Sequence, residues 1–140
     1  MGNPTCPETG QPMVRGVRPM TITYKDHSAA FEMPGWYCEA SGESIHTGED
    51  MKVSDHTLNR LKAKVEGLLL PEDVRRIRKR LGLTQKAAGQ LIGGGVNAFQ
   101  KYESGEVLVS HAITSALILL DRDPAGLTVL KQRLTDRRVA

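Results

Sequence analysis

Polar side chains recur at helical spacing in the stretch VNAFQKYESG, residues 96 to 105. In a helix, Asn97 and Lys101 lie one above the other because they are four residues apart, and Gln100 belongs to the same side. An Asn or Gln amide matches the donor and acceptor of adenine, and a Lys can donate to guanine O6 and N7. These three side chains are therefore candidates for DNA base contacts. A solvated helix surface has the same composition, so the pattern alone leaves both interpretations open.

Three consecutive glycines, Gly93-Gly94-Gly95, precede this stretch in the sequence LGLTQKAAGQLIGGG. The residues before them predict a short helix with Thr84 as its N-cap and Ile92 as its last inward residue. Gly93 can then take the left-handed conformation that ends a helix, and the next two glycines permit a sharp change of direction. A glycine-rich turn also suggests a phosphate-binding loop, but no strand is predicted before it and no GK[ST] follows. We therefore expect a helix-turn-helix, whose second helix lies in the major groove.

Phosphate contacts are expected at the start of the first of these helices and in the turn, where polar groups and backbone amides can face the DNA backbone. The candidates are Thr84, Gln85, Lys86 and Gly95. A denser basic cluster, RRIRKR, occupies residues 75 to 80. Its arginines can equally serve structure, above all Arg75 and Arg80, and Glu103 is the expected partner of one arginine in the cluster.

Five short helices are predicted to form the bundle that positions these residues. Their apolar residues follow 3- and 4-residue spacing, and capping residues mark their ends. The first opens at Pro71 and stops at Gly82, and the second is capped by Thr84. The third runs from about Val96 to Glu103 and stops at Gly105, the fourth is capped by Ser110 and ends before Asp123, and the fifth runs from Gly126 to about Arg138.

The N-terminal part has a different amino-acid composition, rich in proline and glycine. It predicts two strands, Met20 to Tyr24 and Ala30 to Met33, with residues 25 to 28 as the turn, and a further short strand around Trp36 to Cys38. A connecting helix is expected from Ser54 or Asp55 to Glu66, ended by Gly67. The fold class is therefore α+β, with a small β-rich domain and connecting helix in residues 1 to 67 and a helix-turn-helix domain in residues 68 to 140.

Charge divides unevenly along the 140 residues. Residues 1 to 67 hold seven Lys or Arg and nine Asp or Glu, a net of −2, whereas residues 68 to 140 hold twelve and seven, a net of +5. The second part is thus the candidate for contact with a polyanion. The sequence has no apolar run near the length of a membrane span and no signal-like N-terminus, so the expected location is the cytoplasm.

The string GLTQKAAGQLIGGGVNAFQKYESG closely resembles the helix-turn-helix of MqsA-type (YgiT-family) antitoxins, with LTQ, a triple glycine and VNAF..YE.G in this order. The resemblance extends across the chain. It implies a homodimeric antitoxin that neutralises a toxin, commonly an mRNA-cleaving ribonuclease, and represses its own operon by binding a palindrome. It places the base-reading pair on Asn97 and on Lys101, where a known member of the family has arginine. Lysine keeps the charge but lacks the planar guanidinium that donates two parallel hydrogen bonds, so a different operator preference is expected.

The N-terminal part departs from the family, whose members hold a structural zinc with two C-x-x-C pairs. Here Thr9 follows Cys6 and Ser41 follows Cys38 in the positions of the second cysteines. Hydroxyls are poor zinc ligands, so no metal and no other cofactor is expected. Three states of the two cysteines remain open. They are buried reduced thiols, ligands of a weaker metal, or a disulfide. The further ligands of such a metal would come from Glu8, His27, Glu43 or His46.

The expected function is therefore that of a non-enzymatic antitoxin and autorepressor. A free-standing helix-turn-helix transcription regulator without a toxin partner is the alternative. An enzyme that uses Cys6 or Cys38 with His27 or His46 is a further alternative, but the spacing of these residues gives it no support.

Overall fold

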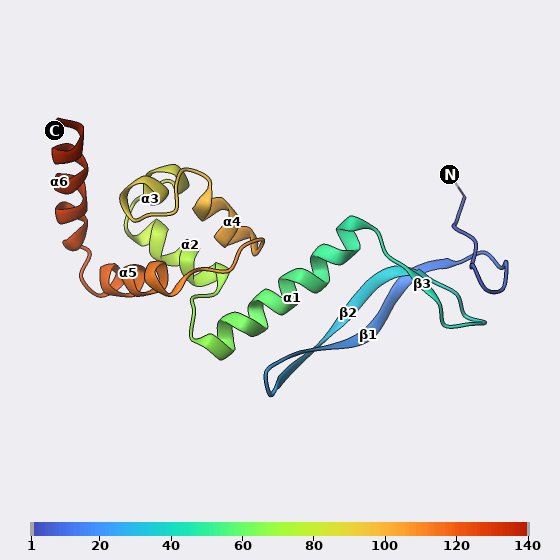
Figure 1. Cartoon of the computed structure of the whole chain (residues 1–140). Coiled ribbons are helices and arrows are strands. Elements are labelled where there is room, and N and C mark those ends of the chain that lie inside the picture. The colour runs from blue at the N-terminus through green and yellow to red at the C-terminus, as the bar shows by residue number, and fades with distance from the viewer. Residues whose placement is uncertain (1, 140) are drawn as a thin grey trace. The chain divides into compact units, whose positions relative to one another are not determined.

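The computed structural model describes residues 2–139. The chain divides into two compact units, Met1–Leu61 and Lys62–Ala140, and the boundary falls inside a single helix, α1 (Gly48–Glu66). The first unit contains a three-stranded antiparallel sheet, and the second contains the helices that follow α1 (Figure 1). The α+β class expected from the sequence is confirmed.

A long hairpin dominates the first unit. Strand β1 (Val14–Tyr24) pairs with β2 (His27–Tyr37) along their full length, from Val14 opposite Tyr37 to Tyr24 opposite His27. Only Lys25 and Asp26 form the turn, and Lys25 has a φ of 53°. The predicted four-residue turn was wrong, because His27 and the residue after it already belong to β2. Two-residue turns with positive φ suit the right-handed twist of an antiparallel pair.

Both strands are longer than predicted because their prolines do not interrupt them. Pro34 lies in β2 opposite Val17, and Pro19 lies in β1 opposite Glu32. The third strand, β3 (Ser44–Ile45), pairs with β2 only at its last two residues, and no described strand pairs with the outer edge of β1. A proline is tolerated where one strand edge is open, because no ladder hydrogen bond is lost there. The strand predicted around Trp36 is therefore the end of β2.

Helix α1 begins at Gly48, earlier than the predicted Ser54. The Thr47 amide donates to Asp50 Oδ2 at 2.9 Å, and the Asp50 amide donates to Thr47 Oγ1 at 3.1 Å. This reciprocal pair is a capping box, which satisfies two amides that have no partner within the helix. Its T-x-x-D signature is present in the sequence, at residues 47 to 50. The helix ends as predicted, with Gly67 at a φ of 72°.

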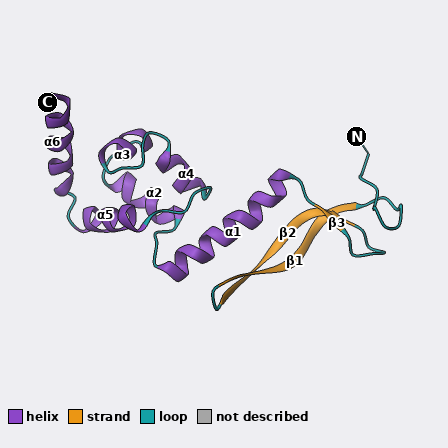
Figure 2. Ribbon diagram, viewed as in Figure 1, coloured by secondary structure: helices purple, strands orange, loops and turns teal. Residues whose placement is uncertain are grey.

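Helices α2 (Pro71–Arg80), α3 (Gln85–Leu91), α4 (Ala98–Ser104), α5 (His111–Arg122) and α6 (Gly126–Val139) form the second unit (Figure 2). The predicted caps are confirmed. Pro71 opens α2, the Thr84 hydroxyl accepts from the Ala87 amide at 3.1 Å, and the Ser110 hydroxyl accepts from the Ile113 amide at 3.1 Å.

One apolar core holds these helices together. It draws residues from α2 to α6 and from the loops between them, namely Val74, Ile77, Leu83, Ala88, Phe99, Tyr102, Val109, Leu117, Leu120 and Leu127. Thr114 is also buried, and its hydroxyl accepts from the Leu69 amide at 3.3 Å, which ties the start of the unit to α5. None of the helices in residues 2–139 combines the length and the apolar character that crossing a bilayer requires.

Candidate functional site

The turn between α3 and α4 uses all three glycines in conformations that other residues rarely adopt. Gly93, Gly94 and Gly95 have φ values of 137°, 97° and 92°. Space is also limited, because a Cβ atom on Gly94 would lie 2.7 Å from Ala98 Cβ and 3.2 Å from the Tyr102 hydroxyl. The triplet is therefore a defined turn that fixes where α4 begins.

A fourth glycine, which the sequence interpretation left unassigned, completes this turn. Gly89 lies within α3, and a Cβ atom there would be 1.9 Å from the carbonyl oxygen of Gly95. The Gly89 carbonyl accepts a hydrogen bond from the Gly95 amide at 3.3 Å. A glycine inside a helical pattern signals close backbone approach, and that signal was available in the sequence.

Helix α4 separates into the two faces that the sequence predicted. It begins at Ala98, two residues later than expected, because Asn97 occupies the N-cap position after the glycine turn. Phe99 is fully buried and Tyr102 is 8% exposed, with their rings edge to face and 5.5 Å between centroids. These two side chains anchor the helix in the core, as expected.

The three proposed base-reading residues lie on the exposed side of the same segment. Asn97, Gln100 and Lys101 are all exposed. Asn97 and Lys101 lie on successive turns, and both line a small hollow in the surface together with Gly94, Ala98, Tyr102 and Val107. The helix therefore presents amide and ammonium groups next to a partly apolar recess, which suits the polar edges and methyl group of bases.

The four expected phosphate-contacting residues differ in exposure and in whether their polar groups are already hydrogen-bonded. Lys86 is exposed, whereas Gln85 is half-buried. The Thr84 hydroxyl already caps α3, and the Gly95 amide already donates to Gly89. Lys86 thus has the clearest capacity for a new ionic contact, and Gly95 contributes through its backbone conformation.

A buried ion pair fixes α4 against α2. Arg78 Nε donates to Glu103 Oε2 at 2.7 Å, and a second guanidinium nitrogen donates to Glu103 Oε1 at 2.8 Å. The side chains are only 12% and 7% exposed, and Arg78 also donates to the Leu83 carbonyl at 2.9 Å. The hydrogen bond to Glu103 raises the pKa of Arg78. The expectation that Glu103 pairs with an arginine of the basic cluster is confirmed.

Two further arginines of this cluster reach α5. Arg80 donates to an Asp121 carboxylate oxygen and to the Asp121 carbonyl oxygen, both at 2.7 Å, and Arg76 lies 3.3 Å from the other carboxylate oxygen. Their hydrogen bonds, that of Arg80 first, lower the pKa of Asp121. Arg80 thus has the expected structural role, whereas Arg75 and Lys79 are exposed.

The two cysteines lie together in the first unit with both hydroxyl residues that follow them. Cys6 Sγ is 3.3 Å from Ser41 Oγ, and Cys38 Sγ is 3.4 Å from Thr9 Oγ1. Both thiols are free and buried, with 2% and 1% exposure, and the fully buried Met13 packs beside them. Cys6 and Cys38 are therefore buried thiols beside hydroxyl groups and are not joined by a disulfide in the structure.

Hydroxyl groups around Cys38 change its acidity. Hydrogen bonds from Ser41, then Thr9, then Cys6 stabilise the thiolate and lower the pKa of Cys38 to about 6. The Cys38 thiol is nevertheless buried, whereas a nucleophilic cysteine must be accessible to its substrate.

The two histidines among the proposed additional metal ligands have other contacts or positions, whereas Glu43 lies in the same loop as Cys38. Both nitrogens of His46 are engaged, Nδ1 with the Pro34 carbonyl at 2.8 Å and Nε2 with the Ser44 hydroxyl at 3.0 Å. His27 begins β2, at the opposite end of the strand from Cys38. Within residues 2–139, no three His, Cys, Asp or Glu side chains gather at a distance suited to a metal ion.

Comparison with known proteins identifies the family. A family sequence model described as "Antitoxin component of bacterial toxin-antitoxin system, MqsA" matches residues 1–131. The chain belongs to the MqsA antitoxin family. It is 32% identical over 129 residues to Antitoxin MqsA of Escherichia coli (strain K12), an alignment that covers 90% of this chain and 98% of that protein. Membership of an antitoxin family implies a cognate toxin as partner.

The structural zinc that the resemblance to MqsA-type antitoxins implied does not fit the donors present. A closed zinc site takes four ligands from thiolates, imidazoles and carboxylates. This MqsA-family chain offers two thiols, of Cys6 and Cys38, and each is hydrogen-bonded to a neutral hydroxyl. Cys6, Thr9, Cys38 and Ser41 still lie together. The chemistry of their donor atoms, and not their position, is therefore what does not fit a zinc site.

Proposed function

We propose that this MqsA-family antitoxin binds operator DNA as a homodimer and represses its own operon, in addition to neutralising its toxin. One observation carries the proposal. Helix α4 exposes Asn97, Gln100 and Lys101 on the side opposite the buried Phe99 and Tyr102. A helix with one face anchored in the core and amide and ammonium groups on the other is suited to the major groove.

The surroundings of α4 support the rigidity that base reading requires. The glycine turn sets its start, and the Arg78–Glu103 pair holds its last turn against α2. Specific readout depends on side chains that are held at defined positions by their support. Lys86 at the start of α3 then supplies a phosphate contact, which fixes orientation without reading sequence.

A dimer would present two such helices to a palindrome, about one helical turn apart. The sequence offers leucines of the last two helices as candidates for this contact, but Leu117, Leu120 and Leu127 lie in the core of the unit. Apolar side chains that remain exposed on the last two helices are better candidates. They are Ile118, Leu119 and Val129, with exposures of 50%, 68% and 69%.

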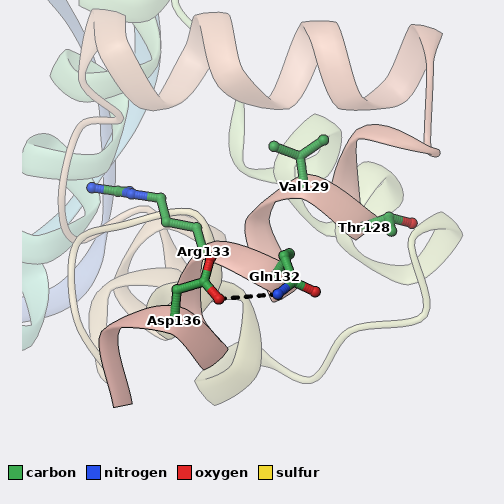
Figure 3. Close-up of a pocket in the computed structure, with 5 residues that line it drawn as sticks. All are labelled: Thr128, Val129, Gln132, Arg133 and Asp136. Atoms are coloured by element: carbon green, nitrogen blue, oxygen red, sulfur yellow. Dashed lines mark hydrogen bonds between the residues drawn. The ribbon is translucent and has the colours of Figure 1, made fainter. Parts of the chain in front are cut away.

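Helix α6 offers a suitable surface for a second copy. Thr128, Val129, Gln132, Arg133 and Asp136 line a shallow depression on this one helix, with Gln132 donating to Asp136 at 3.0 Å (Figure 3). The depression is open and comes from a single element, which does not suit a small-molecule site. A twofold contact through such a face would cover the exposed valine.

We further propose that the toxin is a ribonuclease and that the chain acts in the cytoplasm by binding, without catalysis. The cysteines that a catalytic alternative would need are buried among hydroxyl groups, and His46 is bonded to Pro34 and Ser44. No nucleophile and base therefore lie in hydrogen-bond contact there, as covalent catalysis requires.

Fluorescence anisotropy with duplex DNA from upstream of the chain's own gene tests the DNA proposal. Asn97→Ala is expected to weaken operator binding about tenfold and to leave binding to unrelated DNA unchanged, because it removes a base contact only. Lys86→Ala is expected to weaken both and to reduce the salt slope by about one. Lys64→Ala, which removes an exposed charge from α1, is the control. An operator affinity of Asn97→Ala equal to that of the wild type would refute the groove assignment.

Co-purification of the tagged chain with the product of the neighbouring gene tests the toxin proposal. The expected result is a stable complex in which RNA cleavage by the partner is suppressed. A chain that binds its operator but captures no such partner would be a free-standing regulator, the alternative considered from the sequence.

A further inference from the structure

The two cysteine-containing loops of the first unit are near copies of each other. The Cys6 amide donates to the Gln11 carbonyl at 2.8 Å, and the Cys38 amide donates to the Glu43 carbonyl at 2.9 Å. In each loop a glycine amide, of Gly10 or Gly42, donates to the cysteine carbonyl at 2.9 Å, and these glycines have φ values of 72° and 80°.

The hydroxyl residues repeat this correspondence. The Thr9 hydroxyl accepts from the Gln11 amide at 3.2 Å, and the Ser41 hydroxyl accepts from the Glu43 amide at 3.2 Å. Each hydroxyl also meets the sulfur of the opposite loop, so that the contacts cross between the loops. The result is a closed cluster of two thiols and two hydroxyls, which we call the thiol–hydroxyl cluster (Cys6, Thr9, Cys38 and Ser41).

The spacing within this cluster is close to that of a metal site. A tetrahedral zinc with a sulfur ligand at about 2.3 Å and an oxygen ligand at about 2.1 Å would hold those two atoms roughly 3.6 Å apart. The sulfur–oxygen distances of 3.3 and 3.4 Å are slightly shorter and suit direct hydrogen bonds. The two cross-loop distances are thus near those of a metal site, while the donors support hydrogen bonding instead of coordination.

We propose that the first unit folds without zinc, that the thiol–hydroxyl cluster takes the place of the metal, and that the loops remain able to bind zinc if both thiols are restored. The proposal explains how the sulfurs can be almost fully buried without a metal ion. Buried polar groups are stable when each has a hydrogen-bond partner, and each of the two buried sulfurs has one.

Metal analysis of the full-length chain, purified without chelator, tests the first part. The wild type is expected to contain no stoichiometric zinc, and its thermal midpoint is expected to stay unchanged when EDTA is added. A zinc-dependent fold would instead lose its structure on chelation. One zinc per chain, or a midpoint that falls with EDTA, would overturn the proposal.

The double variant Thr9→Cys/Ser41→Cys tests the second part. It is expected to bind one zinc per chain, to show the thiolate charge-transfer absorption of tetrahedral Co²⁺ when cobalt is substituted, and to become sensitive to EDTA. Thr23→Cys/Ser115→Cys adds two thiols at exposed positions in different units and is expected to bind neither metal stoichiometrically. A folded Thr9→Cys/Ser41→Cys protein without metal would refute the idea that the loops are ready to bind it.

The hydrogen bonds themselves are tested by Thr9→Val, which removes the hydroxyl and keeps the shape of the side chain. Its thermal midpoint is expected to fall by roughly 4–8 °C, because the Cys38 sulfur and the Gln11 amide lose a partner. The wild-type metal content tests the proposal even if variants fail to fold. An unchanged midpoint for Thr9→Val would show that the cluster does not stabilise the unit.

Discussion

At Gly89, inside helix α3, glycine is expected to be more favourable than alanine, which reverses the usual helix preference. Alanine is ordinarily more favourable than glycine within a helix by about 1 kcal/mol. At this position an added Cβ would overlap the Gly95 carbonyl oxygen, which belongs to the backbone and cannot rotate away. The requirement for glycine is therefore imposed by the turn that packs on α3.

Gly89→Ala is expected to destabilise the second unit by about 3 kcal/mol, as overpacking in a rigid core does. Gly48→Ala is the matched control, because Gly48 is also helical and has open space around it. That control is expected to be neutral or slightly stabilising. Urea unfolding of both variants measures the difference, and equal midpoints would contradict the close approach.

The Arg78–Glu103 ion pair is a second feature on which the stability of the second unit depends. Glu103→Gln is expected to lower the stability of the second unit by about 3 kcal/mol, because it leaves a buried guanidinium without its counter-charge. Asp121→Asn is the comparison, since it disturbs the exposed arginines 76 and 80 and is expected to have a much smaller effect. Chemical denaturation of both variants provides the test, and a similar loss in the two would argue against burial as the cause.

At the scale of elements, the start of α1 is linked to β1 through one carboxylate. Asp50 closes the capping box with Thr47, and Arg15 from β1 donates to both of its oxygens, one of them at 2.9 Å. The hydrogen bond from Arg15, more than any other contact, holds the pKa of Asp50 well below its usual range. This carboxylate is buried, so the first unit depends on its ionised form.

The first unit is therefore expected to lose stability in acid. A carboxylate with a depressed pKa contributes stability that is fully present above the unfolded value of about 3.9 and is lost as the pH falls through the folded value. Thermal unfolding from pH 7 down to about pH 1.5 should show this loss, which begins below about pH 5, in the wild type and a flatter profile in Asp50→Asn. Glu49→Gln alters the adjacent, exposed carboxylate and should retain the wild-type profile. Parallel profiles for the wild type and Asp50→Asn would contradict this role.

Local sequence signals predicted the helices of the second unit more accurately than the strands of the first. Thr84, Ser110 and Gly67 mark helix ends through contacts within a few residues, so their roles could be predicted from the sequence. The strands were predicted too short, because Pro19 and Pro34 are breakers only where both strand edges are paired.

In the candidate site too, some features follow from the local sequence and others from tertiary packing. The exposed and buried faces of α4 follow from helical spacing, so the exposure of Asn97 and Lys101 could be predicted. The choice of Arg78 as the partner of Glu103 and the packing of Gly89 depend on how α2, α3 and α4 pack together. No spacing rule along the chain contains that information.

At the scale of the whole molecule, the two units have separate cores. The core of the second unit, with the apolar residues packed against it, lies entirely between Leu69 and Leu130. The core around the cysteines contains Cys6, Met13 and Cys38, with Trp36 packed against it. Neither cluster includes a residue of the other unit.

The fragment of residues 62 to 140 is therefore expected to fold without the first unit and to unfold cooperatively in urea. Its helical circular dichroism and its unfolding midpoint measure this, with the full-length chain as the reference. A fragment that is unfolded, or that unfolds without cooperativity, would contradict the independence of the second core.

The contact between Gly89 and Gly95 also bears on how the sequence of this chain can diverge. Because the crowding involves backbone atoms, exchange of a neighbouring side chain does not by itself make room for a side chain at position 89. By contrast, the side chains of Gln100 and Lys101 point to solvent and carry no part of the core. A lineage of such proteins can therefore exchange the exposed residues of α4 freely while the frame stays fixed, which lets recognition evolve separately from folding.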